Sequence, residues 1–325
     1  MRLYQQLLRD DCAELRILAH PGLRVAYPEL DGSHYVALGS PLRAVRVLRR
    51  AGVIVANTPL ACLVGVVLAG SVPLRRRPTV LHLVHSVPRG WPRTWVVRAA
   101  SRRASVRSCV SYSLAKSWVQ PLRVDPLGVG PGEAVPEPES VSSVPSVFAM
   151  GRPAHVKGLD LYIESLICSG KPDRTADVVL GLTETDSAYS RRLISDVPGW
   201  MVVRTGIGPS TMRSGDILVV PSRAETAALL VQEAMGRGII VVATPVGDVP
   251  LLIDDGATGF VAADVSVHAI GVALRRALDL DAPSRLKVAV SASRASKARE
   301  GEWERVIATV IKDCLLDVPL TRDIK

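Results

Sequence analysis

Residues 216–260 have the sequence DILVVPSRAETAALLVQEAMGRGIIVVATPVGDVPLLIDDGATGF, in which short apolar runs alternate with a helical segment. The runs at 217–220 and 239–243 have the length and the β-branched content of buried strands. Residues 226–237 between them predict a helix that ends at two glycines. A strand, a helix and a second strand in this order predict parallel strands joined by a crossover helix.

Alternation of the same kind extends through the rest of the chain. In the second half, strands are predicted at 146–150, 177–182 and 200–204. In the first half, strands are predicted at 53–56 and 79–84, with helical segments between them. This pattern is typical of a parallel sheet with helices on both faces.

A linker separates these two halves. Residues 126–145, PLGVGPGEAVPEPESVSSVP, are rich in Pro, Gly, Ser and Glu and have no periodicity. We therefore predict an α/β fold of the GT-B kind, in which two Rossmann-like lobes, 1–143 and 144–300, face a cleft. A helix within 301–325 is expected to pack back on the first lobe.

The composition excludes several classes of protein. The chain has 325 residues, 48% of them hydrophobic, so it is long enough for two domains with full cores. Its five cysteines are scattered without a Cys-x-x-Cys pair, which argues against a disulfide scaffold and a structural zinc site and favours the cytoplasm. No signal peptide is expected at the start, and the most apolar stretch, 53–72, is interrupted and too short to span a membrane.

Charge is distributed unevenly along the chain. The net charge is +9, with +10 in residues 1–145 and −1 in residues 146–325. Between Asp31 and Asp125 there are 15 Lys and Arg and no acidic residue. Such a surface attracts anions, for example a phospholipid surface, a phosphorylated acceptor or nucleic acid; the alternative is a solvated basic surface.

Two pairs of charged residues follow predicted strands of the second lobe. Glu225 and Glu233 are eight residues apart, close to two helical turns, so both carboxylates can face one ligand if Glu225 begins the helix. The start of that helix offers unpaired N–H groups to phosphate or sugar hydroxyls. Arg152 and Lys157 follow the strand at 146–150, where two cations can hold a diphosphate without a metal. Taken singly, such residues are more often ordinary surface charges.

The motifs around these residues are more specific than the charges alone. Gly151-Arg152, four residues and Lys157-Gly158 are followed by Pro221-Ser222, Glu225, Glu233-Ala234-Met235, VVAT at 241–244 and DGATG at 255–259. Over nearly all of residues 146–280, this combination resembles the donor-binding domain of the retaining GT-B glycosyltransferases of family 4.

The resemblance implies a role for each matching residue. Arg152 and Lys157 would bind the donor diphosphate, Glu225 the donor sugar and Glu233 the nucleotide ribose. The amides of the intervening loop would bind phosphate and sugar, here at Ala227, Ala228 and Leu229. The pocket for the base would include Thr205 and Gly206. No metal and no cofactor are implied; the co-substrate would be a nucleotide sugar, with UDP- and GDP-sugars the first expectation.

The first lobe resembles the family less closely. His85, after the strand at 79–84, resembles a strand-end histidine near donor and acceptor, although such a histidine is more often structural. Ala228 stands where the family has a loop glycine, and 127–130 read LGVG in place of Asn-Gly-Val-Asp. The opening strand and glycine-rich loop have no counterpart, so the first lobe is expected to be trimmed at its first strand.

We therefore expect a metal-independent, retaining glycosyltransferase with Arg152, Lys157, Glu225 and His85 in catalytic roles. Its acceptor is expected to be an anionic lipid or glycan, because Trp91 and the basic residues near it are typical of peripheral membrane enzymes. A cytoplasmic protein on the inner membrane face fits this expectation. The alternatives are a non-catalytic nucleotide-sugar-binding protein and a nucleic-acid-directed glycosyltransferase, although no nucleic-acid motif is present.

Overall fold

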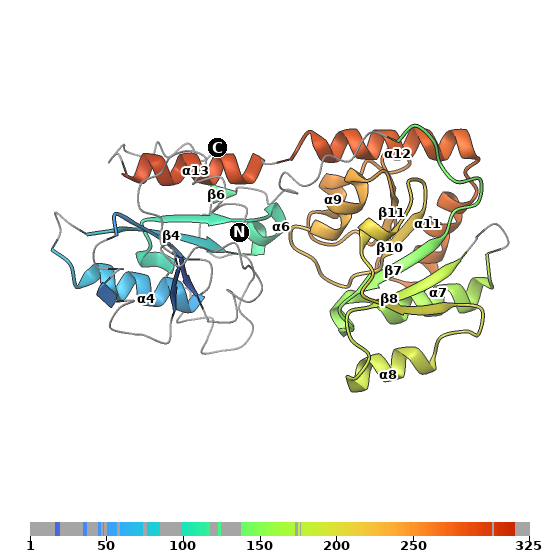
Figure 1. Ribbon diagram of the computed structural model, residues 1–325, viewed down its shortest axis with the longest axis horizontal. Helices are drawn as coiled ribbons and strands as arrows, with labels where there is room; N and C mark the ends of the chain where they lie inside the picture. The colour runs from blue at the N-terminus through green and yellow to red at the C-terminus, as the bar shows by residue number, and fades with distance from the viewer. Residues whose placement is uncertain are drawn as a thin grey trace. The chain divides into compact units, whose positions relative to one another are not determined.

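The chain forms two compact units in the computed structural model, drawn in Figure 1. Unit 1 comprises Met1–Pro126 and Glu302–Lys325, and unit 2 comprises Leu127–Gly301. The structure describes residues 17–19, 35–37, 45–46, 48, 51–56, 59–73, 77–84, 99, 101–117, 123–124, 138–172, 175, 177–300 and 302–315.

Unit 2 is built on a six-stranded parallel sheet with the order β12-β11-β10-β7-β8-β9. Its strands are β7 (Val147–Gly151), β8 (Val178–Leu182), β9 (Val202–Thr205), β10 (Ile217–Val220), β11 (Ile240–Ala243) and β12 (Phe260–Val261). Its helices are α7 (Leu159–Ser169), α8 (Ala188–Ser195), α9 (Leu229–Gly236), α10 (Val249–Leu252), α11 (Val267–Leu278) and α12 (Ala282–Lys297). Two short 3₁₀ turns, His155–Lys157 and Pro209–Thr211, complete the unit.

The strand order of unit 2 reverses direction between β7 and β10. From β7 the chain adds β8 and β9 on one side, and it then returns to place β10, β11 and β12 on the other. The carboxyl ends of β7 and β10 are therefore neighbours, although they are far apart in sequence. In open parallel sheets this reversal point is where ligands bind, because the loops that follow the two strands diverge there.

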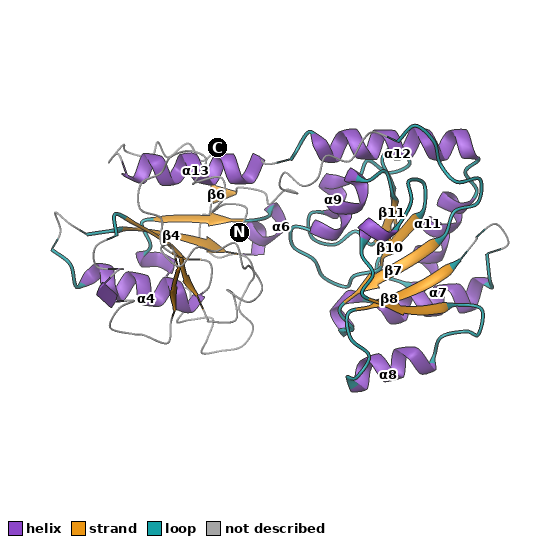
Figure 2. Ribbon diagram, in the orientation of Figure 1, coloured by secondary structure: helices purple, strands orange, loops and turns teal. Residues whose placement is uncertain are grey.

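Helices cover both faces of this sheet, as Figure 2 shows. Successive residues of a strand point to opposite faces, so Val147 and Ala149 enter one core with α7 and α11, while Phe148 and Met150 enter the other with α9. The inner strands β7, β8, β10 and β11 are accordingly apolar on both sides, which is the pattern that predicted a doubly covered parallel sheet, whereas the edge strand β9 is largely exposed.

Unit 1 contains a four-stranded parallel sheet with the order β3-β4-β5-β6 and a separate parallel pair, β1-β2. The strands are β1 (Ile17–Ala19), β2 (Tyr35–Ala37), β3 (Val53–Ala56), β4 (Thr79–Val84), β5 (Val106–Cys109) and β6 (Arg123–Val124). The helices whose bounds are described are α4 (Pro59–Gly70), α6 (Tyr112–Ser117) and α13 (Glu302–Leu315), and α13 packs against β3. Within the described ranges, no helix combines the length and apolar character that a membrane crossing requires.

The predicted α/β class with two parallel sheets is confirmed, but several elements differ from the expectation. The helix predicted over 226–237 begins only at Leu229, because residues 221–228 form a loop. Periodicity did not reveal α8 or α12, since α8 is short and α12 carries many small polar residues. Residues 1–16, where the first lobe is expected to be trimmed, and Trp91 lie outside the described residues.

Candidate functional site

Two loops meet where the strand order reverses. Lys157 lies in the loop after β7 and Glu225 in the loop after β10, and Lys157 Nζ lies 2.5 Å from Glu225 Oε1. The side chains are 32% and 15% exposed, so this ion pair is partly shielded from water and is stronger than a pair on an open surface. The two residues that the sequence placed in one site are therefore in contact.

The turn that presents Lys157 depends on a glycine. Gly158 ends the turn His155–Lys157 and begins α7 with a φ of 63°, a conformation that favours glycine. A Cβ at this position would lie 1.9 Å from the carbonyl oxygen of Pro221. The Lys157 turn can therefore pack directly on the end of β10 only because residue 158 has no side chain.

Arg223 lies in the loop after β10 and forms hydrogen bonds to the loop after β7. Its backbone N–H donates to the carbonyl of Val156 at 2.8 Å, and its guanidinium donates to the carbonyl of His155 at 2.8 Å. Both guanidinium ends also donate to the carboxylate of Asp160, in the first turn of α7, at 2.7 Å. Tyr189 of α8 donates to that carboxylate at 3.1 Å.

The contacts between Arg223, Asp160 and Tyr189 shift the pKa values of Asp160 and Tyr189. Burial raises the pKa of Asp160, but the hydrogen bonds and the charge of Arg223 outweigh it, so the pKa lies below its ordinary value. Burial and the neighbouring Asp160 carboxylate raise the pKa of Tyr189 to about 12. At neutral pH the carboxylate is therefore ionised and the phenol is protonated, as the hydrogen bonds require.

A third loop, which follows β11, packs against the loop that carries Glu225. Ser222 Oγ donates to Glu225 Oε1 at 2.8 Å, and Thr244 Oγ1, after β11, donates to the carbonyl of Ser222 at 2.5 Å. Gly247 has a φ of 62°, and a Cβ there would lie 2.5 Å from the carbonyl oxygen of Glu225. The Glu225 carboxylate is thus fixed by two donors, and its backbone is fixed by a close packing contact.

The loop then enters α9 through Ala227, Ala228 and Leu229. Gln232 Nε2, which is buried, donates to the carbonyl of Ala227 at 2.8 Å. Because the C=O and N–H of a trans peptide point in opposite directions, this bond turns the N–H of Ala228 away from Gln232. The first amides of α9 have no acceptor within the helix and can donate to an anion.

Ala228 adopts an unusual backbone conformation for its residue type. Its φ and ψ are 46° and 49°, and it is the one non-glycine residue with positive φ in the part of the chain that the structure describes. The left-handed conformation costs an L-residue about 1 kcal/mol or more. The position therefore keeps the backbone geometry of a glycine although it carries a methyl group.

The other residues predicted for the site are Arg152, Thr205, Gly206, Glu233 and His85. Arg152 follows β7 directly and is exposed, and within the described residues it forms no ion pair. Thr205 ends the edge strand β9, and Gly206 follows with a φ of 70°. Glu233 lies on α9 and is half-buried, whereas Glu225 precedes the helix, so the two-turn spacing expected of this pair is wrong. His85 lies outside the described residues.

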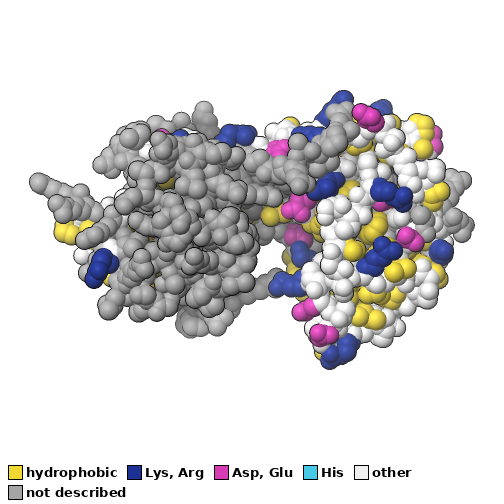
Figure 3. Space-filling model, in the orientation of Figure 1, with side chains coloured by type: hydrophobic (Ala, Val, Ile, Leu, Met, Phe, Trp, Pro, Cys, Tyr) yellow, Lys and Arg dark blue, Asp and Glu magenta, His cyan; other side chains and the backbone are white. Residues whose placement is uncertain are grey.

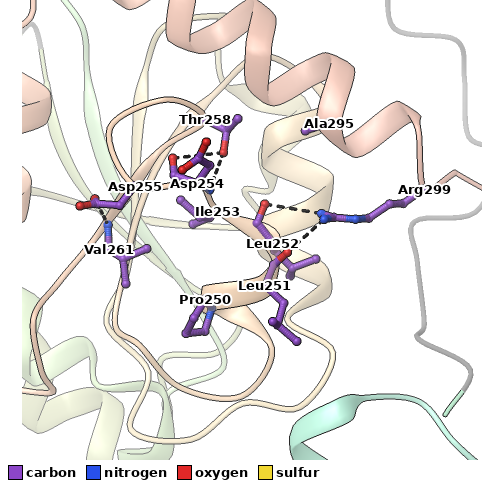
Figure 4. Close-up of a pocket in the computed structure, with 10 residues that line it drawn as sticks. All are labelled: Pro250, Leu251, Leu252, Ile253, Asp254, Asp255, Thr258, Val261, Ala295 and Arg299. Carbon is purple, nitrogen blue, oxygen red and sulfur yellow. Dashed lines mark hydrogen bonds between the residues drawn. The ribbon is translucent and has the colours of Figure 1, made fainter. Parts of the chain in front are cut away.

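The pocket drawn in Figure 4 lies elsewhere in unit 2 and involves none of these residues. It is an open hollow of about 530 Å³ between α10, the loop 253–258, β12 and α12. Arg299 on its rim donates to the carbonyls of Leu251 and Leu252, so its guanidinium is held by the end of α10. No group of three His, Cys, Asp or Glu side chains that could hold a metal ion occurs in the described ranges.

Sequence reasoning did not assign roles to Ser222, Arg223 and Asp160. Ser222 belongs to a Pro-Ser motif that was noted, so its proximity to Glu225 was within reach of the sequence. Arg223 and Asp160 are 63 residues apart and leave no local signal, because their pairing depends on β7 and β10 being neighbours.

The arrangement can bind an anion and a polyol together. Arg152, which has no ion-pair partner in the part of the chain that the structure describes, the Lys157 ammonium and the amides before α9 supply positive charge. The carboxylates of Glu225 and Glu233 can accept hydrogen bonds from hydroxyl groups. Elsewhere on unit 2, Lys and Arg are interspersed with Asp and Glu over the face visible in Figure 3. By sequence, unit 1 has 23 Lys and Arg against 11 Asp and Glu, a net charge of +12, and unit 2 has a net charge of −3.

Comparison with known proteins identifies the part of the chain that holds this site. Residues 144–279 match the family described as "Glycosyl transferases group 1". A glycogen synthase of Xanthomonas oryzae pv. oryzae (strain PXO99A) is 29% identical over 175 residues, which are 50% of this chain and 32% of that protein. A D-inositol 3-phosphate glycosyltransferase of Corynebacterium glutamicum (strain R) is 30% identical over 152 residues, 46% of this chain and 34% of that protein.

The fold itself is shared over a longer range. The structure of HepE from Anabaena, in complex with UDP and glucose, matches 96% of this chain and 94% of its own with a TM-score of 0.76 and 16% sequence identity. The predicted two-lobed α/β fold is thereby confirmed. The chain spans about a third of the length of the curated relatives that it matches.

Proposed function

We propose that this protein transfers a sugar from a nucleotide-sugar donor to an acceptor hydroxyl with retention of configuration, because residues 144–279 match the family described as "Glycosyl transferases group 1". The observation that supports the proposal most directly is the contact of Lys157 and Ser222 with Glu225 where the strand order reverses. The HepE structure, which has the same fold, holds UDP and glucose. A UDP- or GDP-sugar is therefore the donor we expect.

In the proposed donor site, different residues bind different parts of the nucleotide sugar. Arg152 and Lys157 bind the diphosphate, with Arg152 offering the planar fork of donors that matches phosphate oxygens. The amides of Ala227, Ala228 and Leu229 bind phosphate and sugar oxygens.

The remaining donor contacts follow from the same assignment. Glu225 accepts from the sugar hydroxyls and Glu233 from the ribose. Thr205 and Gly206 border the base. Thr205 ends β9 at the carboxyl edge of the sheet that also carries the Lys157 and Glu225 loops, which supports this placement.

The proposed reaction needs no metal. The bond between the anomeric carbon and the diphosphate oxygen breaks, and the acceptor oxygen bonds to the anomeric carbon on the same face. The acceptor proton passes to the departing phosphate oxygen. Arg152 and Lys157 stabilise the negative charge that develops on the diphosphate, which is the step where fixed cations contribute most.

Unit 1 supports a proposal about the acceptor. Its net charge of +12 favours an anionic acceptor, such as a phosphorylated lipid or glycan, and contact with an anionic membrane from the cytoplasmic side. His85 follows β4 in this unit and is proposed to lie near donor and acceptor. A lipid-linked acceptor predicts co-sedimentation with vesicles that rises with their content of anionic lipid, and indifference to that content would remove it.

A thermal-shift panel tests the donor site. Full-length protein is melted with UDP-, GDP-, ADP- and dTDP-glucose without added metal, and the same panel is run on Arg152→Ala and on Arg213→Ala. Arg213 lies before the amino end of β10, at the opposite edge of the sheet, so it serves as the matched control.

We expect one nucleotide sugar to raise the melting temperature of the wild type and of Arg213→Ala but not of Arg152→Ala. Turnover with that donor, measured as release of the nucleoside diphosphate, then separates a transferase from a binding protein. Absence of a shift with all four sugars, or an equal shift in Arg152→Ala, contradicts the proposed site.

A further inference from the structure

Arg223 makes more polar contacts with the Lys157 loop than any residue assigned a role above. Its backbone N–H and its guanidinium hold the carbonyls of Val156 and His155, both at 2.8 Å. These two carbonyls belong to the two residues that immediately precede Lys157 in its turn. Arg223 itself is two residues from Glu225 in the loop after β10.

Asp160 of α7 also holds the guanidinium of Arg223. Asp160 accepts from both of its terminal nitrogens at 2.7 Å, and Tyr189 donates to the same carboxylate. The side chains of Arg223 and Asp160 are 25% and 27% exposed, so water competes weakly for these bonds. A bidentate pair fixes the orientation of the guanidinium plane, which a lysine ammonium cannot do.

From these contacts we infer that Arg223 is a positioning residue, which holds the turn before Lys157 so that the Lys157 ammonium stays at Glu225 and at the donor diphosphate. This inference rests on the proposed function for the identity of the ligand. The positioning itself is a property of the ligand-free protein. Among the described residues, the hydrogen bonds of Arg223 to this turn go to the carbonyls of His155 and Val156, so we infer that it acts through the backbone of these two residues.

If Arg223 positions Lys157, substitution of Arg223 should lower turnover well below the melting temperature, and not only the stability of the fold. A displacement of about 1 Å in a group that stabilises a transition state costs about a hundredfold in rate. We expect Arg223→Met to lower kcat/KM for the donor by about a hundredfold and Arg223→Lys by about tenfold, mostly in kcat. A merely structural role would lower the melting temperature and leave turnover well below that temperature unchanged.

The chain offers a matched control in Arg276. Arg276 also pairs with an aspartate, donating to both oxygens of Asp255 at 3.1 Å, but it lies on α11 beside the edge strand β12, which β11 and β10 separate from β7. Arg276→Met therefore removes an arginine–aspartate pair without disturbing the loops after β7 and β10.

Two measurements on the full chain test the inference. The first is amide hydrogen exchange of residues 156–158 without ligand, and the second is the thermal shift and turnover with the glucose nucleotides named above. We expect faster exchange and weaker donor response in Arg223→Met, intermediate values in Arg223→Lys, and wild-type values in Arg276→Met. If Arg223→Met does not fold, Arg223→Lys gives the same comparison.

The outcomes separate this inference from the proposed function. Unchanged exchange at residues 156–158 in both Arg223 variants overturns the positioning role. Faster exchange with unchanged turnover also overturns it, and it leaves the proposed function standing if Arg152→Ala has lost its response. A wild type that responds to no nucleotide sugar overturns the proposed function, and with it the assignment of Arg223 to donor turnover.

Discussion

Lys157 and Glu225 are 68 residues apart in sequence and form an ion pair of 2.5 Å between the loops that follow two neighbouring parallel strands. The pair neutralises part of the Lys157 charge before any ligand binds, while Arg152 remains unpaired among the described residues. In the proposed donor site, an arriving diphosphate would compete with Glu225 for Lys157. The same competition would free the Glu225 carboxylate for a sugar hydroxyl, so the pair would couple recognition of the two parts of a nucleotide sugar.

Substitution of Glu225 is predicted to separate binding from turnover. Glu225→Gln keeps an acceptor for Ser222 but removes the charge that competes for Lys157, so UDP or GDP alone should bind as tightly as in the wild type or a few-fold more tightly. Transfer should fall by about a hundredfold or more in Glu225→Gln and Glu225→Ala, because the sugar loses its charged partner. Calorimetric titration and a transfer assay measure the two effects, and full transfer by Glu225→Ala would refute the assignment.

Substitution of Gly158 is predicted to disrupt the packing of the Lys157 loop. Gly158→Ala must both adopt positive φ and place a methyl group 1.9 Å from the oxygen of Pro221, so the loops after β7 and β10 must separate. Gly170 also has positive φ, but a methyl group there would meet no atom within 4 Å, so Gly170→Ala carries only the backbone cost of its φ of 77° and ψ of 173°, about 1–3 kcal/mol. Denaturant unfolding should show a clearly larger loss in Gly158→Ala, and equal losses would contradict the close contact.

Replacement of Ala228 by glycine is predicted to stabilise unit 2. The left-handed conformation costs alanine about 1–2 kcal/mol that glycine does not incur, whereas removal of one buried methyl group costs about 0.8 kcal/mol. We expect a rise of about 2 °C in melting temperature. Ala234→Gly, in the interior of α9, is the control and should lower the melting temperature. A fall in both variants would show that the methyl packing of Ala228 dominates.

The Asp160 carboxylate predicts a pH dependence of stability. Its folded-state pKa lies below the unfolded value, so the stabilisation is present above the unfolded pKa, about 3.9, and is lost as the pH falls through the folded pKa. Wild type should therefore lose more unfolding free energy than Asp160→Asn between about pH 6 and about pH 3. Parallel urea titrations across this range measure the difference, and identical pH profiles would contradict the strength of the Arg223 pair.

Sequence periodicity was sufficient for the inner strands of unit 2, β7, β8, β10 and β11, because they are apolar on both faces. Runs such as ILVV at 217–220 and IVVA at 240–243 are typical of strands buried in a doubly covered parallel sheet. The motifs around Lys157 and Glu225 also identified residues that the structure brings into contact. Periodicity failed for α12, where alanines and serines pack against α9 without a strong apolar face.

What the sequence by itself determined was the class of the fold, the order of its strands along the chain and the residue types at the ends of those strands. Only the tertiary structure decided that β10 returns beside β7, and hence that Arg223 meets the Asp160 carboxylate and Lys157 meets the Glu225 carboxylate. The physical reason is that strand order depends on which helices share each face of the sheet. That choice minimises exposed apolar surface over the whole lobe and leaves no mark on any local stretch of sequence.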